Sequence, residues 1–245
     1  FYGVGRANDG EGVGFLGGSV LGLVSAPCQK RKQMRIGILG SGDVGKALAV
    51  GFLASGHEVM VGSRDAAKLE EWRKTTAPKA TLGSFAQTAA FGDVVVLATV
   101  WNGTESAIKL AGVDALRGKT VIDVTNPLVF AEGKPPALAL GHHDSGGEQV
   151  QRWLPGSHVV KAFNIVGNAH MYKPDFPGGP PTMFLCGNDA EAKRVVTSFL
   201  DAFGWEAIDI GGIEGSRLLE PMCILWVQYA LQGGGWNHAF KLLRK

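Results

Sequence analysis

The amino-acid sequence predicts an α/β fold of the Rossmann type, in which helices cover both faces of a doubly wound parallel sheet within a single domain. Three observations support this prediction. Short apolar segments alternate with helix-forming segments along most of the chain, which is typical of parallel strands joined by crossover helices. The run 93–99 is almost wholly apolar, as in a strand covered on both faces. A glycine-rich turn at 40–45 joins the first strand to the first helix.

The individual elements follow from apolar spacing and from their flanking residues. We expect strands at 34–39, 58–61, 93–99, 120–125, 158–164, 182–186 and 206–210, and helices at 46–55, 66–75, 84–91, 104–116, 189–203 and 216–232. Pro221 should bend or restart the last helix, because proline removes one backbone donor. The loop 129–149 is rich in Gly, Pro and His and is expected to be the most mobile segment.

The amino-acid composition and net charge exclude several classes of function. The 245 residues are 45% hydrophobic and 19% charged, which is ordinary for a protein with a large core. A net charge of +2 is too small to favour a nucleic-acid partner. Cys28, Cys186 and Cys223 lie far apart and form no Cys/His cluster, so we expect reduced thiols, no metal site and a cytoplasmic location.

The beginning of the chain differs in character from the rest. We expect residues 1–33 to be a flexible leader outside the fold, followed by one NADP-binding domain at 34–245. The apolar segment 14–26 is the nearest match to a signal-peptide core, but Asp9 and Glu11 offset Arg6 where a basic lead-in is expected. A degenerate targeting segment stays open as an alternative. No apolar stretch approaches the ~20 residues that cross a bilayer, so no membrane partner is expected.

The turn at 40–45 is the strongest functional signal. A GxGxxG pattern is weak evidence among 36 glycines, but here a strand precedes it and a helix follows it. Gly40 would permit the tight turn, Gly42 would let the backbone approach a pyrophosphate, and Gly45 would let the helix pack close to the strand. The free N–H groups of the helix would then face the phosphates. The alternative is a structural glycine turn in another kind of α/β protein.

The end of the second strand indicates which dinucleotide is bound. NAD-binding folds place an acidic residue about 20 residues after the turn to hold the ribose 2′-OH. This chain has Gly62-Ser63-Arg64 there, and a hydroxyl beside a guanidinium suits a 2′-phosphate. Lys68 would add positive charge, and Asp65 is expected to point away as a helix N-cap. NADP(H) is therefore the expected cofactor, with a solvated arginine on an ordinary loop as the alternative.

Three strand ends should form the rest of the cleft, because ligands of open α/β sheets bind outside the carboxyl ends of the strands. They are Thr99-Val100-Trp101, Thr125-Asn126-Pro127 and Ala162-Phe163-Asn164. None contains an acid/base pair, and His57, His142 and His143 are interpreted as surface histidines. We therefore assign no catalytic residue. This absence suits hydride transfer between a nicotinamide and a flavin-like ring, in which the cofactors carry the chemistry and the protein positions them.

Several longer segments carry a family resemblance. They are MRIGILGSGDVGKALA, GHEVMVGSRD, TNPL, VVKAFN, LCGNDAEAKRVV and SRLLEP. From Met34 onwards the chain resembles the NADPH-dependent reductases of the 8-hydroxy-5-deazaflavin coenzyme, and it is similar to the cytoplasmic reductase domain of the six-transmembrane ferric reductases. The resemblance implies that the pyrophosphate is bound by Gly40, Ser41, Gly42, Asp43 and Val44, and the 2′-phosphate by Ser63 and Arg64. It also implies that the nicotinamide side is contacted by Thr99, Val100 and Trp101. The deazaflavin ring would bind near Ala162, Phe163 and Asn164.

The chain also departs from this pattern. Residues 164–168 replace a His- and Pro-containing turn of the deazaflavin reductases and are closer to the ferric-reductase domain, which uses a flavin. FMN or FAD is therefore an alternative to 8-hydroxy-5-deazaflavin as the co-substrate. The loop 132–147 has no counterpart in the family, and the membrane part of the ferric reductases has no match in the sequence.

Three functional hypotheses follow. The leading one is an enzyme that transfers hydride between NADPH and a deazaflavin or flavin, with a small-molecule redox acceptor as its partner. A non-catalytic NADP(H)-binding or redox-sensing module fits the same residues. A small imine or ketone reductase would need an ionisable residue near the nicotinamide, and the strand ends offer none.

The last helix, 216–232, is too apolar for a solvated surface helix. Burial in the core is one interpretation. The other is a homodimer contact through Met222, Trp226 and Tyr229.

Overall fold

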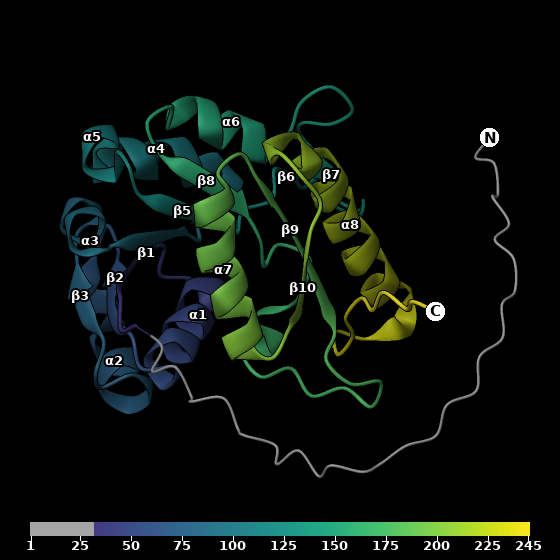
Figure 1. Ribbon diagram of the computed structural model, residues 1–245, viewed down its shortest axis with the longest axis horizontal. Helices are drawn as coiled ribbons and strands as arrows, with labels where there is room; N and C mark the ends of the chain where they lie inside the picture. Colours follow the sequence, from purple (N-terminus) through teal and green to yellow (C-terminus); the bar gives the residue numbers. More distant parts are fainter. Residues whose placement is uncertain (1–31) are drawn as a thin grey trace, which may run out of the picture. The chain divides into compact units, whose positions relative to one another are not determined.

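A computed structural model describes residues 32–245. The leader predicted at 1–33 lies almost entirely outside the described residues. The main sheet has the strand order β10-β9-β8-β5-β4-β1-β2-β3 (Figure 1). Its strands are β1 (Arg35–Leu39), β2 (Glu58–Gly62), β3 (Thr81–Gly83), β4 (Val94–Leu97), β5 (Thr120–Asp123), β8 (His158–Lys161), β9 (Thr182–Gly187) and β10 (Glu206–Asp209). The short strands β6 (Leu128–Val129) and β7 (Ala137–Leu138) form a separate antiparallel pair.

Helices and short helical turns alternate with these strands along the described chain. They are α1 (Asp43–Ala54), α2 (Glu70–Thr76), α3 (Phe85–Phe91), α4 (Trp101–Ala111), α5 (Val113–Leu116), α6 (Gly146–Trp153), α7 (Ala190–Phe203) and α8 (Ser216–Tyr229), with short helical turns η1 (Ala66–Leu69), η2 (Asn168–His170), η3 (Ile213–Gly215) and η4 (Ala230–Gly234). Several helices begin where the sequence offers a cap. Ser84 and Gln87 form a capping box at α3, and Asp189 accepts the Ala192 N–H at the start of α7.

The sheet confirms the doubly wound Rossmann-type fold, and most of it is parallel. Strands β3, β2, β1, β4, β5 and β8 run in one direction, and the strand order reverses between β1 and β4. Strand β9 runs antiparallel to β8, and β10 runs parallel to β9. The expectation of a fully parallel sheet is therefore wrong at this edge. The segment between β8 and β9 contains only the turn η2, and without a crossover helix the chain returns in the opposite direction.

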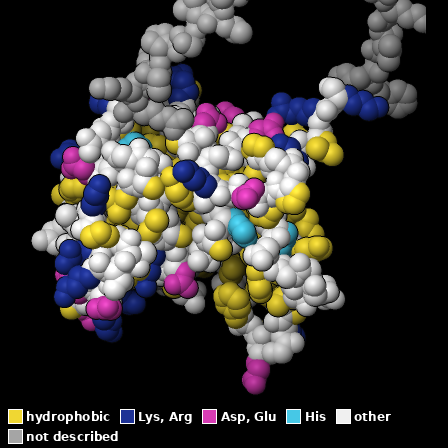
Figure 2. Space-filling model, turned by 90° about the horizontal axis from the view of Figure 1, so that it is seen from below, with side chains coloured by type: hydrophobic (Ala, Val, Ile, Leu, Met, Phe, Trp, Pro, Cys, Tyr) yellow, Lys and Arg dark blue, Asp and Glu magenta, His cyan; other side chains and the backbone are white. Residues whose placement is uncertain are grey.

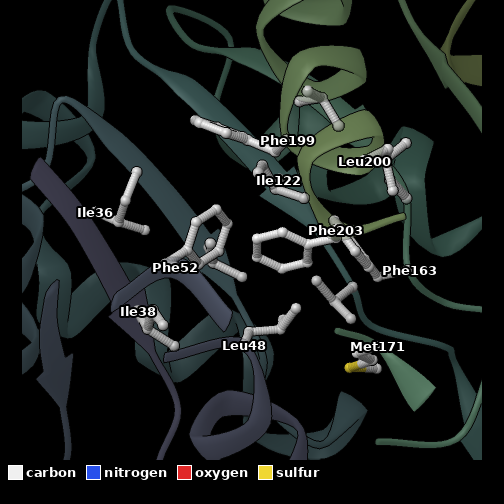
Figure 3. Packing of buried hydrophobic residues seen from close by; sticks show 14 of the residues in the cluster. Ile36, Ile38, Leu48, Phe52, Ile122, Phe163, Met171, Phe199, Leu200 and Phe203 are labelled. Atoms are coloured by element: carbon white, nitrogen blue, oxygen red, sulfur yellow. The ribbon is translucent and has the colours of Figure 1, made fainter. Parts of the chain in front are cut away.

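Apolar side chains cover both faces of the sheet because strand residues alternate in direction. Ile36, Val94 and Val96 face the cluster that α1 and α7 cover, whereas Val95 and Leu97 face the cluster of α3, α4 and α6. The rings of the first cluster pack edge to face or at a tilt between the sheet and α7 (Figure 3). One large core on each face holds the strand ends in fixed positions.

Three sequence expectations need correction. The expected loop 129–149 includes the last residue of β6, the whole of β7 and the first residues of α6, none of which was predicted; its mobility stays a prediction. Helix α8 does not restart at Pro221, which lies on the exposed face while Leu219 and Cys223 are buried around it; a bend at this residue stays a prediction. His57 is not a surface histidine. It packs against the rings of Phe52 and Phe199 and is only 7% exposed.

Helix α8 is buried along one face and exposed along the other. Trp226 is buried in its own chain, where its indole N–H donates to the His238 carbonyl at 2.9 Å, so it is not accessible for a dimer contact. Met222 is half-buried, and Tyr229 is exposed together with Leu218 and Leu225. A homodimer through the exposed face of α8 stays a prediction.

The surface of the described residues is mixed in character. Figure 2 shows Lys and Arg side chains interspersed with acidic and hydrophobic ones on the face that it presents. No helix within residues 32–245 combines the length and apolar character that a membrane span requires.

A bidentate ion pair ties α6 to α8 and makes this contact sensitive to pH. Arg217 donates to both carboxylate oxygens of Glu148, at 2.8 and 2.5 Å, and Ser145 donates to the same carboxylate at 2.7 Å. The hydrogen bond from Arg217, helped by Ser145 and opposed by burial, holds the pKa of Glu148 below its ordinary value of 4.5. A lowered folded-state pKa stabilises the fold above the unfolded-state value, and this contribution is lost as the pH falls through the folded-state value.

We therefore expect Glu148→Gln to lower the urea midpoint at pH 7. The difference from the unmodified chain should shrink as the pH falls below about 4.5, where the unfolded carboxyl becomes protonated. Urea titrations followed by circular dichroism between pH 3 and pH 7 would measure this. Glu71→Gln is the matched control, since the Glu71 side chain has no ion-pair partner within the described chain. A constant difference across the pH range would contradict the role of the ion pair.

Candidate functional site

The glycine turn between β1 and α1 forms one end of a cleft at the carboxyl ends of the parallel strands. Gly40 has φ +135°, and a Cβ at this position would overlap the Ala98 carbonyl. A Cβ on Gly45 would overlap the Gly40 carbonyl, so α1 can approach the strand only with glycine here. A Cβ on Gly42 would meet no heavy atom within 4 Å, because this residue opens toward solvent. The turn therefore keeps an uncovered backbone surface at the helix start.

Helix α1 presents unpaired backbone donors at this surface. Gly42 is its N-cap and has no side chain to satisfy the first N–H groups. Asp43 and Val44 are the first two helical residues, and Ser41 precedes the cap. A twelve-residue helix carries a partial positive charge at this end. The geometry suits an anion bound by the backbone, as a pyrophosphate would be.

Ser63 and Arg64 lie on the loop after β2, next to the glycine turn. Ser63 Oγ is 3.3 Å from Ser41 Oγ, which joins the two loops, and it accepts the Asp65 N–H at 3.1 Å. Arg64 is exposed, and within residues 32–245 its guanidinium has no ion pair or hydrogen bond. The same cleft, of about 450 Å³, contains the side chains and backbone of both loops and of α4: Gly40, Ser41, Gly42, Ser63, Arg64, Asp65, Lys68, Phe85, Ala98, Thr99, Val100, Gly103, Ser106, Ala107 and Leu110.

Asp65 and Lys68 behave differently from their expected roles. Asp65 does occupy the N-cap position of η1, but its carboxylate makes no capping hydrogen bond. Instead it lies 3.6 Å from Lys68 Nζ, with both side chains exposed. This pair offsets part of the positive charge that Lys68 was expected to add, and such an exposed pair is weak and easily rearranged. Arg64 is thus the unpaired cation at this end of the cleft in the described chain.

The second wall of the cleft begins after β4. Thr99 Oγ1 lies 2.9 Å from Thr104 Oγ1, which ties the loop to α4. Val100 is the N-cap of α4 and is 81% exposed, an unusual position for an apolar side chain. Trp101 stacks on Trp153 with ring centroids 5.6 Å apart. The structure therefore brings Thr99 and Val100 to the cleft and turns Trp101 toward α6.

Asn126 and Asn164 connect the next two strand ends through reciprocal amide contacts. Asn126 Nδ2 donates to the Asn164 carbonyl, and Asn164 Nδ2 donates to Asn126 Oδ1, both at 2.9 Å. Asn164 Nδ2 also donates to the Leu219 carbonyl of α8 at 3.0 Å. These contacts fix the loop after β5, including Pro127, against the loop after β8. The pairing joins two of the three strand ends that the sequence assigns to the cleft.

Ala162 and Phe163 lie behind this wall. Both are buried, with exposures of 0% and 1%, and belong to the core that α1 and α7 cover. Phe163 has φ +61°, a left-handed backbone that non-glycine residues seldom adopt. This conformation turns the chain at the end of β8 and sends Asn164 toward Asn126. Strained backbone of this kind persists where the surrounding structure holds it, often beside a binding site.

A fully buried charged group lies at the carboxyl ends of β5 and β8 and was not predicted. Lys161 Nζ is 2.7 Å from Asp123 Oδ2 and 2.9 Å from Glu220 Oε1. It also donates to the Thr125 carbonyl at 2.8 Å. Burial by itself would lower the pKa of Lys161, but the two carboxylates outweigh it and hold that pKa above its ordinary value. The ammonium therefore stays charged in the core.

Helices α6 and α8 also contribute to the buried charged group around Lys161. The Glu220 carboxylate accepts the backbone N–H groups of Gly146 and Gly147, both at 2.9 Å. The sequence did contain a signal: a lysine, an aspartate and a glutamate each interrupt an otherwise apolar strand or helix. Each is common on a surface, and only the tertiary contacts reveal that all three are buried together.

Two cysteines border the same region. Cys186 and Cys223 are free and buried, and burial raises the pKa of each thiol to about 11. Thiols of this kind are unreactive at neutral pH. Cys28 lies outside the described residues. No group of three or more His, Cys, Asp or Glu side chains within residues 32–245 is arranged to hold a metal ion.

The fold and the cleft together define a dinucleotide-binding domain of the Rossmann type, because a glycine turn meets a helix N-terminus beside the reversal in strand order. Residues 35–127 match the family described as "NADP oxidoreductase coenzyme F420-dependent". A candidate F420-dependent NADP reductase from Arthrobacter sp. FB24 has a crystal structure that superimposes with a TM-score of 0.81, at 36% identity over 86% of this chain and all of that one. The chain therefore belongs to this family of NADP-dependent oxidoreductases.

Two curated proteins are also similar to the chain. The chain is 28% identical over 222 residues to the F420-dependent NADP reductase of Methanothermobacter thermautotrophicus, covering 85% of this chain and 94% of the relative. It is 31% identical over 197 residues to metalloreductase STEAP3 of Rattus norvegicus. That match covers 77% of this chain but only 36% of the metalloreductase. The resemblance inferred from the sequence motifs is confirmed.

Lys161 offers a direct test of the buried charged group. We expect Lys161→Met to lower the free energy of unfolding by about 3–5 kcal/mol, because it leaves two buried carboxylates without their cation. Chemical denaturation at pH 7 measures the change. Lys109→Met is the control, since Lys109 pairs with Glu105 on the surface of α4 and should matter little. Equal effects of the two substitutions would show that the buried pairing contributes no special stability.

Proposed function

We propose that the chain is an oxidoreductase that transfers hydride between NADPH and 8-hydroxy-5-deazaflavin. The observation that carries this proposal is the placement of an unpaired guanidinium, Arg64, in the same cleft as the uncovered glycine turn. One element suits two bridging phosphates and the other suits a third phosphate on the ribose. The family assignment and the near-complete coverage of the Methanothermobacter reductase support the same cofactor and acceptor.

Different residues of the cleft would bind the different parts of NADPH. The backbone at Gly42, Asp43 and Val44 would hold the pyrophosphate, with Ser41 beside it. Ser63 and Arg64 would bind the 2′-phosphate through a hydroxyl and a planar fork of N–H donors. The adenine would lie along α4, where Gly103, Ala107 and Leu110 provide small and apolar surface. Phosphates at the glycine turn would leave the nicotinamide end to extend toward the ends of β4, β5 and β8.

The chemistry at that end needs positioning more than proton transfer. Bound NADPH supplies the hydride, and the acceptor ring receives it. Thr99, Val100 and Asn126 are uncharged and would set the distance and stacking of the two rings. Val100 is exposed and apolar, which suits a residue that covers a planar ring and excludes water. No acid or base from the chain is assigned to the step.

Arg64 should discriminate between the two nicotinamide dinucleotides. We expect Arg64→Ala to weaken NADPH binding by about 1.5–3 kcal/mol, the range for a charged hydrogen bond, and to leave NADH binding nearly unchanged. Fluorescence titration with each dinucleotide measures both affinities. Arg73→Ala is the matched control, because Arg73 already pairs with Glu70 on α2. Equal losses for NADPH and NADH would count against the assignment of Arg64.

The acceptor is tested by rapid mixing. We expect NADPH absorbance to decay in single-turnover mixing with 8-hydroxy-5-deazaflavin, and to decay more slowly with FMN or FAD. Faster decay with a flavin would reassign the acceptor while keeping the hydride transfer. Binding of NADPH without oxidation by any of the three would instead identify a non-catalytic NADP(H)-binding module.

A further inference from the structure

The buried charged group occupies a particular place relative to the cleft. Asp123 and Lys161 are the last residues of the neighbouring parallel strands β5 and β8, and they are paired in the sheet register. Their side chains point to the same face as Val121 and Val159, toward α6. Thr125, whose carbonyl accepts from Lys161, immediately precedes Asn126. The charges therefore lie at the carboxyl ends of β5 and β8, and β5 adjoins β4, whose following residues Ala98, Thr99 and Val100 line the cleft.

The formal charges of the buried group do not sum to zero. It contains two carboxylates, Asp123 and Glu220, and one ammonium, Lys161, so it carries one excess negative charge. The N–H groups of Gly146 and Gly147 and the N-terminal end of α6 offset part of this excess. Two nearby ion pairs, Arg217 with Glu148 and Arg152 with Asp144, are each neutral as a pair. A negative field remains at this edge of the sheet.

We propose that the excess charge of the Asp123–Lys161–Glu220 group makes the cleft select the oxidised nicotinamide over the reduced one. This inference rests on the proposed function. The ring of NADP+ is a cation, whereas the ring of NADPH is neutral. All three side chains are at most 1% exposed, and buried charges are screened far less by water and salt than surface charges. The negative field therefore stabilises the cationic ring alone.

The same field favours one direction of the reaction. When hydride leaves NADPH, the C4–H bond breaks with its electron pair, the acceptor ring gains the hydride, and a solvent proton completes the reduced acceptor. The nicotinamide ring becomes positively charged as the hydride departs. Asp123 and Glu220 then lower the energy of that developing charge, because they are in place before the reaction begins.

A purely structural role would not need this charge imbalance. One ammonium and one carboxylate would join β5 to β8, and a neutral amide oxygen could accept the Gly146 and Gly147 N–H groups that Glu220 now binds. Glu220 is the surplus carboxylate, since it adds a second charge that must be desolvated. It is therefore the residue whose neutralisation separates the electrostatic role from the structural one.

The test compares the affinities of NADP+ and NADPH for Glu220→Gln, for Asp123→Asn and for the unmodified chain. Glu220→Gln and Asp123→Asn each remove one negative charge from a different element, so either folded variant suffices. Glu214→Gln is the control, because Glu214 is an exposed carboxylate six positions before Glu220. Fluorescence titration gives the Kd of NADPH, and competition gives the Kd of NADP+, with no acceptor present.

We expect the ratio of the NADP+ Kd to the NADPH Kd to rise about three- to tenfold in the two neutralised variants. Two unit charges roughly 15 Å apart change an affinity by about this factor at an effective dielectric of about 20. The ratio should not change in Glu214→Gln. Equal weakening of both dinucleotides, or an unchanged ratio, would overturn the inference and leave the proposed function intact. Failure of the unmodified chain to bind either dinucleotide would overturn both.

Discussion

The close approach of α1 to the end of β1 is the constraint on which the rest of the site depends. Glycine at position 45 removes the Cβ that would hold the helix away from the Gly40 carbonyl, and glycine at position 40 removes the Cβ that would overlap the Ala98 carbonyl after β4. With the helix in this position, its first N–H groups open at the point where the strand order reverses. The loops after β2 and β4 then meet around that opening. Two large apolar clusters, one on each face of the sheet, keep these strand ends in register.

The ends of β5 and β8 are joined by polar groups rather than by apolar packing. Asn126 and Asn164 link two strand ends through their amides, and the buried ammonium of Lys161 lies below them. Hydrogen bonds from fixed donors define the orientation of such a junction more sharply than apolar contacts do. The arrangement also draws α8 into the site, since Leu219 and Glu220 both contact this network. Helix α8 therefore supports the cleft although it lies far from the glycine turn in the sequence.

The sequence predicted the parts of the structure that depend on local patterns. The glycine turn, the Ser63–Arg64 loop and most strands follow from spacing within short segments. The reversal of β9 was missed, because the direction of a strand depends on how its connection crosses the sheet. Lys161 was missed for a related reason: its two carboxylate partners lie 38 and 59 positions away in the chain. A single sequence gives no sign of such partners, and the burial of Ala162 behind the wall was equally hidden.

Because β9 is reversed, the two halves of the sheet differ in the positive helix ends that they present to a phosphate. Because β9 runs against β8, helix α7 begins at the rim away from the glycine turn, where Asp189 lies 3.6 Å from His158 at the first residue of β8. The positive end of α7 therefore points away from the cleft. The start of α6 does lie beside the cleft wall, but the carboxylate of Glu220 already occupies its first N–H groups. Neither α6 nor α7 therefore has free N-terminal N–H groups facing the cleft. A second polyphosphate would bind to either helix less favourably than to the start of α1.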